Sequence, residues 1–199
     1  ELSSEQEVLQ YISGQMGEAA PKMADIHPKD RTDLQGGVNK YTALALKAKA
    51  DLELENYQDV ADATSQIINS GVFSLEEDFY QLFKLEGKLN EENIFELQYS
   101  DFGQGSGENR SYLFAFFGPQ NWTPAVDGAN SGWGFWEPTL EYIQFMLDRG
   151  EKTRLQTSVL FTPDGISELQ DKYGELPNWV SSETPSCDII EDRPRGRFF

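Results

Sequence analysis

The segment from Asn39 to Gly71 constrains the fold most, because two helical patterns follow each other with almost no connection. Asn39 is a favourable N-cap, and a run of alanine and leucine follows it at helical spacing. The pattern breaks at Asn56-Tyr57 and then resumes, and Gly71 is suited to a helix C-terminal cap. Because alanine lets backbones approach closely, we expect an antiparallel hairpin of two tightly packed helices.

A single hairpin cannot bury its own apolar face, so this one must stack on more of the chain. Its construction is that of a tetratricopeptide-like unit. A further helix is predicted over about 5–20, where Ser4 and Glu7 have capping-box spacing. Apolar residues between Phe73 and Phe83 are expected to pack under the hairpin. The predicted fold class is mainly α, a tetratricopeptide-like helical scaffold with long irregular loops and a few short strands.

The second half of the chain changes character. Residues 100–137 are rich in glycine, asparagine and aromatic residues, a composition that favours a shaped loop over disorder. The other predicted elements are a loop at 21–37 with an exposed His27, strands at 94–99 and 157–161, a helix starting at Pro138, a turn at 163–165 and irregular structure from 170 onward. We expect a helical tetratricopeptide-like part at 1–89 and a loop-rich, ligand-side part at 90–199 of the same domain.

Charge and composition exclude several functions. The net charge is -18, so the chain repels phosphate backbones and no nucleic-acid partner is expected. Cys187 and His27 are each the only residue of their type, which removes an intrachain disulfide, most zinc sites and any Ser-His-Asp or Cys-His arrangement with a histidine from another segment. The acidic residues lie in solvated surface runs rather than in a glycosidase pair. We therefore expect a protein that is not an enzyme.

Four stretches of the sequence occur in a characteristic order. The first is the hairpin, from Gly36-Gly37-Val38-Asn39-Lys40-Tyr41-Thr42-Ala43 to Ile67-Ile68-Asn69-Ser70-Gly71-Val72-Phe73-Ser74-Leu75. The others are Asn90-Glu91-Glu92-Asn93-Ile94-Phe95-Glu96-Leu97-Gln98-Tyr99, Gly132-Trp133-Gly134-Phe135-Trp136-Glu137-Pro138-Thr139-Leu140 and Lys152-Thr153-Arg154-Leu155-Gln156-Thr157-Ser158-Val159. Together they resemble the SusD/RagB family of nutrient-binding lipoproteins, although Lys152-Thr153 stands where the family has Asp-Pro.

The resemblance implies a function and a location. It implies a non-catalytic protein that is lipid-anchored on the outer surface of a Gram-negative outer membrane. It also implies an oligosaccharide ligand and a partner, a SusC-type TonB-dependent transporter. The chain is shorter than a usual family member, so we expect a fragment without the leader and the lipid-bearing cysteine, and membrane contact only through that anchor.

The candidate ligand-binding residues lie in the aromatic and polar stretch at 109–136. Sugar rings present apolar C–H faces with a rim of hydroxyls, so a sugar site needs flat aromatic side chains beside amides, carboxylates or guanidinium groups. The candidates are Asn109, Arg110, Tyr112, Asn121, Trp122, Asp127, Asn130, Trp133 and Trp136. An alternative assigns Trp133 and Trp136 to core packing at the start of the next helix, and Phe114, Phe116 and Phe117 are expected in the core.

Other readings of the sequence stay open. The hairpin alone fits a tetratricopeptide-type module that binds a protein or peptide. No cofactor is expected, and a structural calcium ion is possible, although no spacing of Asp and Asn residues indicates one. The run Gly103-Gln104-Gly105-Ser106-Gly107 lacks the lysine and helix start of a phosphate-binding loop.

Overall fold

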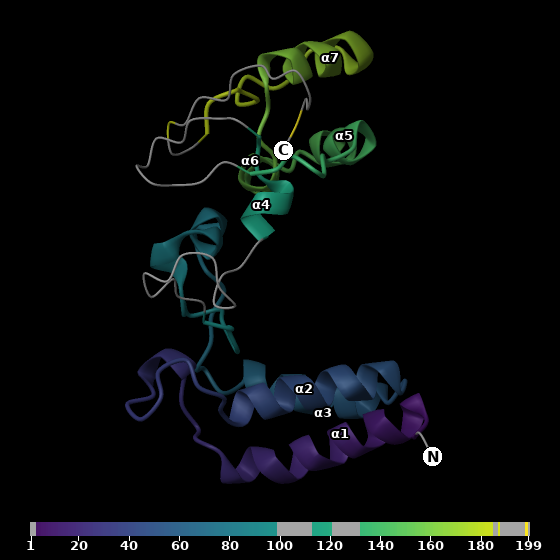
Figure 1. The fold of residues 1–199 in the computed structure, drawn as a ribbon. Coiled ribbons are helices and arrows are strands. Elements are labelled where there is room, and N and C mark those ends of the chain that lie inside the picture. Colours follow the sequence, from purple (N-terminus) through teal and green to yellow (C-terminus); the bar gives the residue numbers. More distant parts are fainter. Residues whose placement is uncertain (1–2, 99–112, 121–131, 185–186, 188–197, 199) are drawn as a thin grey trace. The chain divides into compact units, whose positions relative to one another are not determined.

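A computed structural model describes residues 3–98, 113–120, 132–184, 187 and 198. These residues form a mainly helical protein, which confirms the predicted class at that level (Figure 1). The chain divides into two compact units, Glu1–Gln98 and Tyr99–Phe199. We refer to them as unit 1 and unit 2 and describe each by itself.

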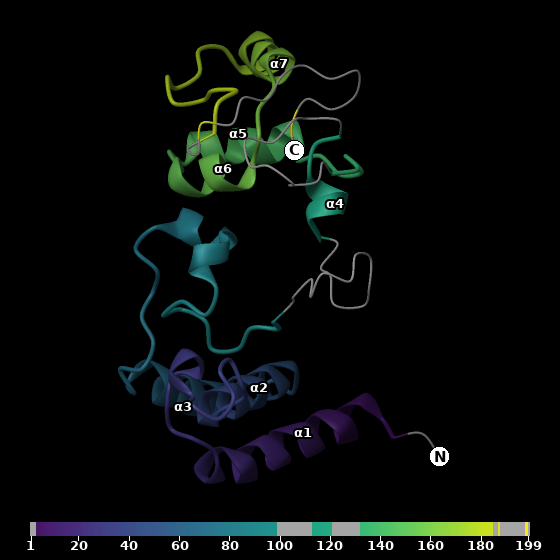
Figure 2. The same cartoon turned by 60° about the vertical axis from the view of Figure 1, so that its left-hand side comes forward.

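Unit 1 is built on three helices, α1 (Glu5–Ala19), α2 (Lys40–Glu53) and α3 (Tyr57–Ile68). Helix α2 packs against both α1 and α3, and only three residues separate it from α3, so these two form the predicted hairpin (Figures 1 and 2). The buried apolar residues are mostly small: Ala20, Tyr41, Ala43, Leu44, Ala48, Ala63 and Ile67. Small side chains at the contacts bring the helix backbones close together.

Local capping explains where two of these helices begin. The Ser4 side chain accepts a hydrogen bond from the Glu7 backbone N–H, and the Glu7 carboxylate accepts one from the Ser4 N–H at 2.7 Å. Asn39 is fully buried and accepts from the Thr42 N–H at 2.9 Å. Its amide also donates to the Ile26 carbonyl at 2.8 Å, which ties the preceding loop to the start of α2. Both predicted N-caps are confirmed.

A buried charge links the three helices of unit 1. The Asp51 carboxylate on α2 accepts hydrogen bonds from the Ser13 hydroxyl on α1 at 2.7 Å and from the Lys47 ammonium at 2.5 Å. Lys47 also lies 3.6 Å from Asp59 on α3. Burial alone would raise the pKa of the Asp51 carboxyl, but the hydrogen bonds from Lys47 and Ser13 outweigh it and hold that pKa below its usual value.

The loop between α1 and α2 differs from its prediction at His27. This segment contains two short 3₁₀ turns, η1 (Ala20–Lys22) and η2 (Pro28–Asp30). His27 is 3% exposed, so the prediction of an exposed histidine is wrong. The loop folds back on the hairpin, and this places the imidazole ring 4.9 Å from the ring of Phe73. Its Nδ1 accepts a hydrogen bond from the Lys29 N–H, which starts η2.

The rest of unit 1, residues 69–98, contains the 3₁₀ turns η3 (Phe79–Phe83) and η4 (Leu85–Gly87). Phe73 packs against Tyr41 under the hairpin as predicted, whereas Leu75 and Phe83 are exposed. The described part of the predicted strand at 94–99 is not a strand. The Thr42 hydroxyl donates to the carbonyl of Ile94 at 3.3 Å, in place of the inter-strand hydrogen bonds that a strand requires.

The described residues of unit 2 form four helices, which are labelled in Figure 2: α4 (Leu113–Phe117), α5 (Leu140–Asp148), α6 (Thr153–Ser158) and α7 (Pro163–Tyr173). Its core consists mostly of large side chains: Ile143, Met146, Leu155, Val159, Phe161, Leu169 and Phe198. Thr139 caps α5, so the helix predicted near Pro138 is present. Tyr142 and Phe145, predicted for its core face, are instead exposed, because only Ile143 and Met146 point fully into the core.

Two other predictions in unit 2 are wrong. Helix α6 occupies the start of the predicted strand at 157–161, and Phe161 makes only an isolated bridge to Phe198. The predicted turn Pro163-Asp164-Gly165 is the first turn of α7. There the Thr162 hydroxyl accepts from the Gly165 N–H at 3.0 Å. Proline is suited to the first turn of a helix because that turn leaves its N–H groups without helical partners.

Candidate aromatic binding site

Trp133 and Trp136 belong to a group of five aromatic side chains in unit 2. The group joins α4 to the segment that precedes α5. Phe116 lies at its centre, with ring-centroid distances of 5.1 Å to Trp136, 5.2 Å to Trp133 and 6.0 Å to Phe135. Phe117 lies 5.2 Å from Trp136. We call these five residues the aromatic cluster.

The aromatic cluster is open to solvent. Only Phe116 is half-buried, and the other four side chains surround it. Their exposed fractions are Trp133 42%, Trp136 52%, Phe117 53% and Phe135 62%. Contiguous exposed apolar surface is uncommon on a soluble protein and marks an interaction site. The cluster is therefore the strongest candidate binding surface among the described residues.

Backbone hydrogen bonds hold the two segments of the cluster together. The N–H of Gly132 donates to Pro119 O at 2.9 Å, and the N–H of Gly134 donates to Gly118 O at 3.0 Å. The N–H of Phe135 donates to Phe116 O at 3.1 Å. The segment that carries both tryptophans is thereby fixed along α4 and the residues just after it, and the ring positions follow from that attachment.

The two glycines of this segment have separate structural roles. A Cβ atom on Gly132 would lie 2.1 Å from the carbonyl oxygen of Gly118, so no larger residue fits this close backbone approach. Gly134 has φ +60°, a left-handed conformation that costs energy for residues with a Cβ. Glycine at both positions is what lets Trp133 and Phe135 lie against α4.

The rings meet at different angles. Trp136 is stacked on Phe116 with 29° between the planes, whereas Trp133 meets Phe116 edge-on at 82°. Stacked and edge-on contacts between aromatic rings are both favourable, and they restrict rotation of the side chains. The cluster can thus offer apolar faces in more than one orientation.

Only two of the nine predicted site residues can be compared with the structure. Trp133 and Trp136 lie together in the aromatic cluster. The other seven lie outside the described residues: Asn109, Arg110, Tyr112, Asn121, Trp122, Asp127 and Asn130.

The sequence prediction also missed part of the cluster. Phe117 was expected in the core and is exposed, because the five-residue α4 buries Ala115 instead. Phe116 was expected there too and is half-buried. Phe135 was not proposed as a site residue, although its place between Trp133 and Trp136, next to Gly134, could have indicated it.

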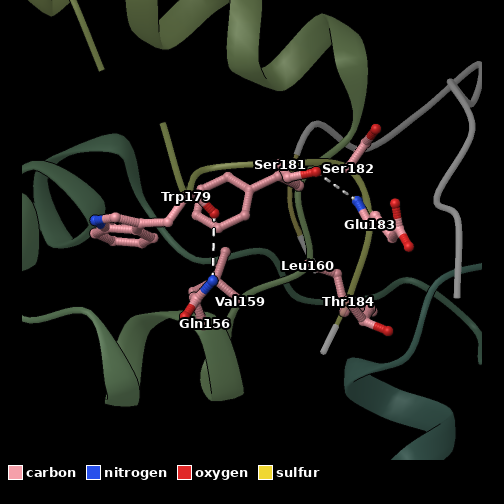
Figure 3. Close-up of a pocket in the computed structure, with 9 residues that line it drawn as sticks. Gln156, Val159, Leu160, Trp179, Ser181, Ser182, Glu183 and Thr184 are labelled. Atoms are coloured by element: carbon pink, nitrogen blue, oxygen red, sulfur yellow. Dashed lines mark hydrogen bonds between the residues drawn. The ribbon is translucent and has the colours of Figure 1, made fainter. Parts of the chain in front are cut away.

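Among the described residues, two of the hollows lie outside the cluster. One in unit 2, lined by Gln156, Phe161 and Trp179 among others, has room for about one water molecule, so it cannot hold a sugar ring (Figure 3). Across it Gln156 donates to the Trp179 carbonyl at 3.3 Å. The other is a groove of about 360 Å³ in unit 1, between α1 and α3 over α2. Lys40, Lys47, Asp62 and Gln66 line it, and buried Leu44 and Ala63 form part of its surface.

The described part of the chain contains no group of three or more His, Cys, Asp or Glu side chains arranged to hold a metal ion. None of its helices is both long enough and apolar enough to cross a membrane.

Comparisons with known proteins leave the family unassigned. No protein-family model matches the chain. Neither the curated proteins nor the solved structures give a match to it.

Proposed function

We propose that this protein is a non-catalytic glycan-binding protein whose aromatic cluster contacts the sugar. The observation that carries the proposal is the group of four exposed rings around Phe116, held to α4 by backbone hydrogen bonds. The proposed role is capture of oligosaccharides for a SusC-type TonB-dependent transporter, from a lipid-anchored position on the outer membrane. The family resemblance of the sequence supports that part, as it does the tetratricopeptide-like character of the helical scaffold.

The chemistry of the cluster suits a sugar. The C–H face of a pyranose is apolar and lies well on an aromatic ring, while its hydroxyls need nearby polar groups. The predicted polar residues at 109–130 are close in sequence to the cluster and would supply such groups. A pair of aromatic side chains contributes roughly 0.5–1.5 kcal/mol beyond the area it buries. If a sugar face on a ring contributes a comparable amount, several rings are needed for useful affinity.

Calorimetric titration of the 199-residue chain against a panel of soluble oligosaccharides tests the proposal. We expect binding of at least one, and a loss of about tenfold in affinity for Trp136→Ala. Phe145→Ala is the matched control, because Phe145 is a ring of similar exposure (55%) in the same unit but outside the cluster. Absence of binding to every oligosaccharide, or equal losses in the two variants, would refute the proposal.

The groove of unit 1 favours a second candidate function, binding of a peptide segment by a tetratricopeptide-type module. It has room for a few side chains, and lysine, aspartate and glutamine line its walls. Under this hypothesis a peptide selected by display on the protein would lose affinity when Gln66→Trp blocks the groove. The control is Gln58→Trp, an exposed residue of the same helix outside the groove. Equal affinity of both variants would eliminate the groove as the peptide site.

A further inference from the structure

We infer that His27 makes one loop of unit 1 sensitive to pH: protonation of its imidazole releases the turn η2 while the three helices stay folded. Three contacts hold η2 in place. The Lys29 N–H donates to the His27 ring, this ring packs on Phe73, and the Lys29 ammonium pairs with the Glu91 carboxylate. We call these three contacts the His27 latch. The inference goes beyond both proposed functions and depends on neither.

The backbone of η2 sets the protonation state of the imidazole in the closed latch. The Nδ1 of His27 accepts a hydrogen bond from the Lys29 N–H at 3.1 Å, so Nδ1 carries no proton and Nε2 carries the only one of the ring. A further proton can therefore bind only at Nδ1. Two N–H groups would then face each other, and the side-chain cap that starts η2 would be lost.

The position of the ring does not suit a positive charge. His27 is 3% exposed, and its Nε2 is buried without a hydrogen-bond partner among the described residues. The ring centroid lies 4.9 Å from that of Phe73, which is apolar. Burying a charge without hydrogen bonds is more costly than leaving it in water. Protonation therefore favours the state in which the imidazole reaches solvent.

The charged groups around the imidazole do not reverse this preference. Lys29 and Asp30 belong to η2, and Glu91 lies in the segment that packs against it. Burial, the largest effect, lowers the pKa of His27, and so does the Lys29 ammonium; Glu91 and Asp30 raise it by less. The Glu91 carboxylate is already paired with Lys29, and the Glu91 carbonyl accepts from the Ser74 N–H at 3.1 Å.

The opening has a defined extent. The Gly36 N–H donates to the Pro28 carbonyl at 2.8 Å, so residues 28–36 are expected to move together. The Asn39 amide holds the Ile26 carbonyl at the start of α2, and this bond marks where the moving part ends. Opening exposes the fully buried Pro28 and one side of Phe73. Unit 1 therefore presents additional apolar surface at mildly acidic pH.

Hydrogen exchange of the Lys29 and Gly36 amides, followed by nuclear magnetic resonance on the ¹⁵N-labelled chain, tests the inference. Dividing each rate by the intrinsic rate at the same pH gives the protection of the amide. In the open latch His27 has its ordinary pKa of 6.5, so the open state gains about tenfold in population per pH unit below that value. We expect protection of both amides to fall about tenfold from about pH 7.5 to about pH 5.5, while the α2 amides keep theirs.

Two substitutions separate the latch from a general effect of acid. His27→Asn keeps a side-chain acceptor for the cap but does not titrate in this range, so protection should be the same at both pH values. His27→Ala has no acceptor, so protection should be low at both. Equal protection at the two pH values in the unchanged protein would overturn the inference. So would a tenfold fall in His27→Asn, or a parallel loss of protection in α2.

Discussion

The two units use aromatic residues in opposite ways. In unit 1, Tyr41 and Phe73 meet edge-on at 5.2 Å inside a core made largely of alanine. In unit 2, leucine, isoleucine and phenylalanine fill the core, and the rings of Trp133 and Trp136 stay exposed. The number of aromatic residues in a unit therefore says little about whether the unit has a binding site. What distinguishes unit 2 is that its described core is formed without these rings, so their exposed faces are available for a ligand.

The cores also differ in what holds them together. Unit 1 combines close helix contacts through alanine with a buried carboxylate, Asp51, shared by α1 and α2. The described core of unit 2 depends on the volume of large side chains. All four tryptophans of the chain lie in unit 2, so tryptophan fluorescence reports its unfolding separately from the helical circular dichroism of the whole chain.

Leu155→Ala should give the largest stability change. Leu155 is fully buried, and its replacement leaves a cavity that costs about 3 kcal/mol in free energy of unfolding. Urea unfolding followed by tryptophan fluorescence should show the loss. If the free energy of unfolding falls by less than a third of this amount, the core of unit 2 is loosely packed. The contrast between the ways in which the two cores are held together would then be removed.

Asp51→Ala should destabilise unit 1 by about 2 kcal/mol. The variant leaves the Ser13 hydroxyl and the Lys47 ammonium without their acceptor, although Lys47 is partly exposed and keeps Asp59 nearby. Urea unfolding followed by far-ultraviolet circular dichroism measures this, with Asp59→Asn as the exposed control. An equal effect in both variants would contradict the central position of Asp51.

Ala43→Leu should destabilise unit 1 by about 1–2 kcal/mol, because extra methylene groups do not fit a close helix contact. Ala43 is 2% exposed and belongs to the same core as Ala48 and Ala63. Ala61→Leu, on the exposed face of α3, is the control. If the buried leucine stabilises the protein instead, the helices of the hairpin are not closely packed.

The smallest of these effects is a pH dependence centred on His27. Burial lowers the pKa of the imidazole below its ordinary value of 6.5. The Lys29 ammonium lowers this pKa further, and the carboxylates of Glu91 and Asp30 oppose the change without reversing it. The unfolded chain then binds the proton more readily than the folded one. Stability is therefore complete above pH 6.5 and falls as the pH decreases below it. In the His27→Gln variant, the midpoint of urea unfolding should change less with pH between about pH 5 and pH 7 than in the unchanged protein. If the urea midpoint of the variant depends on pH as steeply as that of the unchanged protein, the titrating group is not His27.

Local signals in the sequence were sufficient for part of this structure. The N-caps Ser4 and Asn39 and the hairpin were predictable, because capping and helical period depend on neighbouring residues. The strand predicted at 157–161 failed because strand formation depends on a partner, and Phe161 pairs only with Phe198. At Pro163, a turn and a helix start share the same local sequence preference.

The candidate site was less predictable than the helices. The sequence indicated Trp133 and Trp136 but not which of their neighbours would remain exposed. Exposure of Phe117 depends on which side of a short helix packs, and exposure of Phe135 depends on backbone contacts between segments far apart in the sequence. The angles between the rings of the cluster follow from those contacts and not from residue spacing.

The most direct test of the account is nuclear magnetic resonance on the ¹⁵N-labelled protein. The indole N–H signals are assigned by single tryptophan replacements, and the protein is titrated with the neutral oligosaccharide that binds most tightly. We predict that the Trp133 and Trp136 signals shift with the ligand, while the signal of Trp179, which packs against the core of unit 2, stays in place. Shifts at Trp179 or in the backbone of α2 and α3, with Trp133 and Trp136 unchanged, would contradict the account.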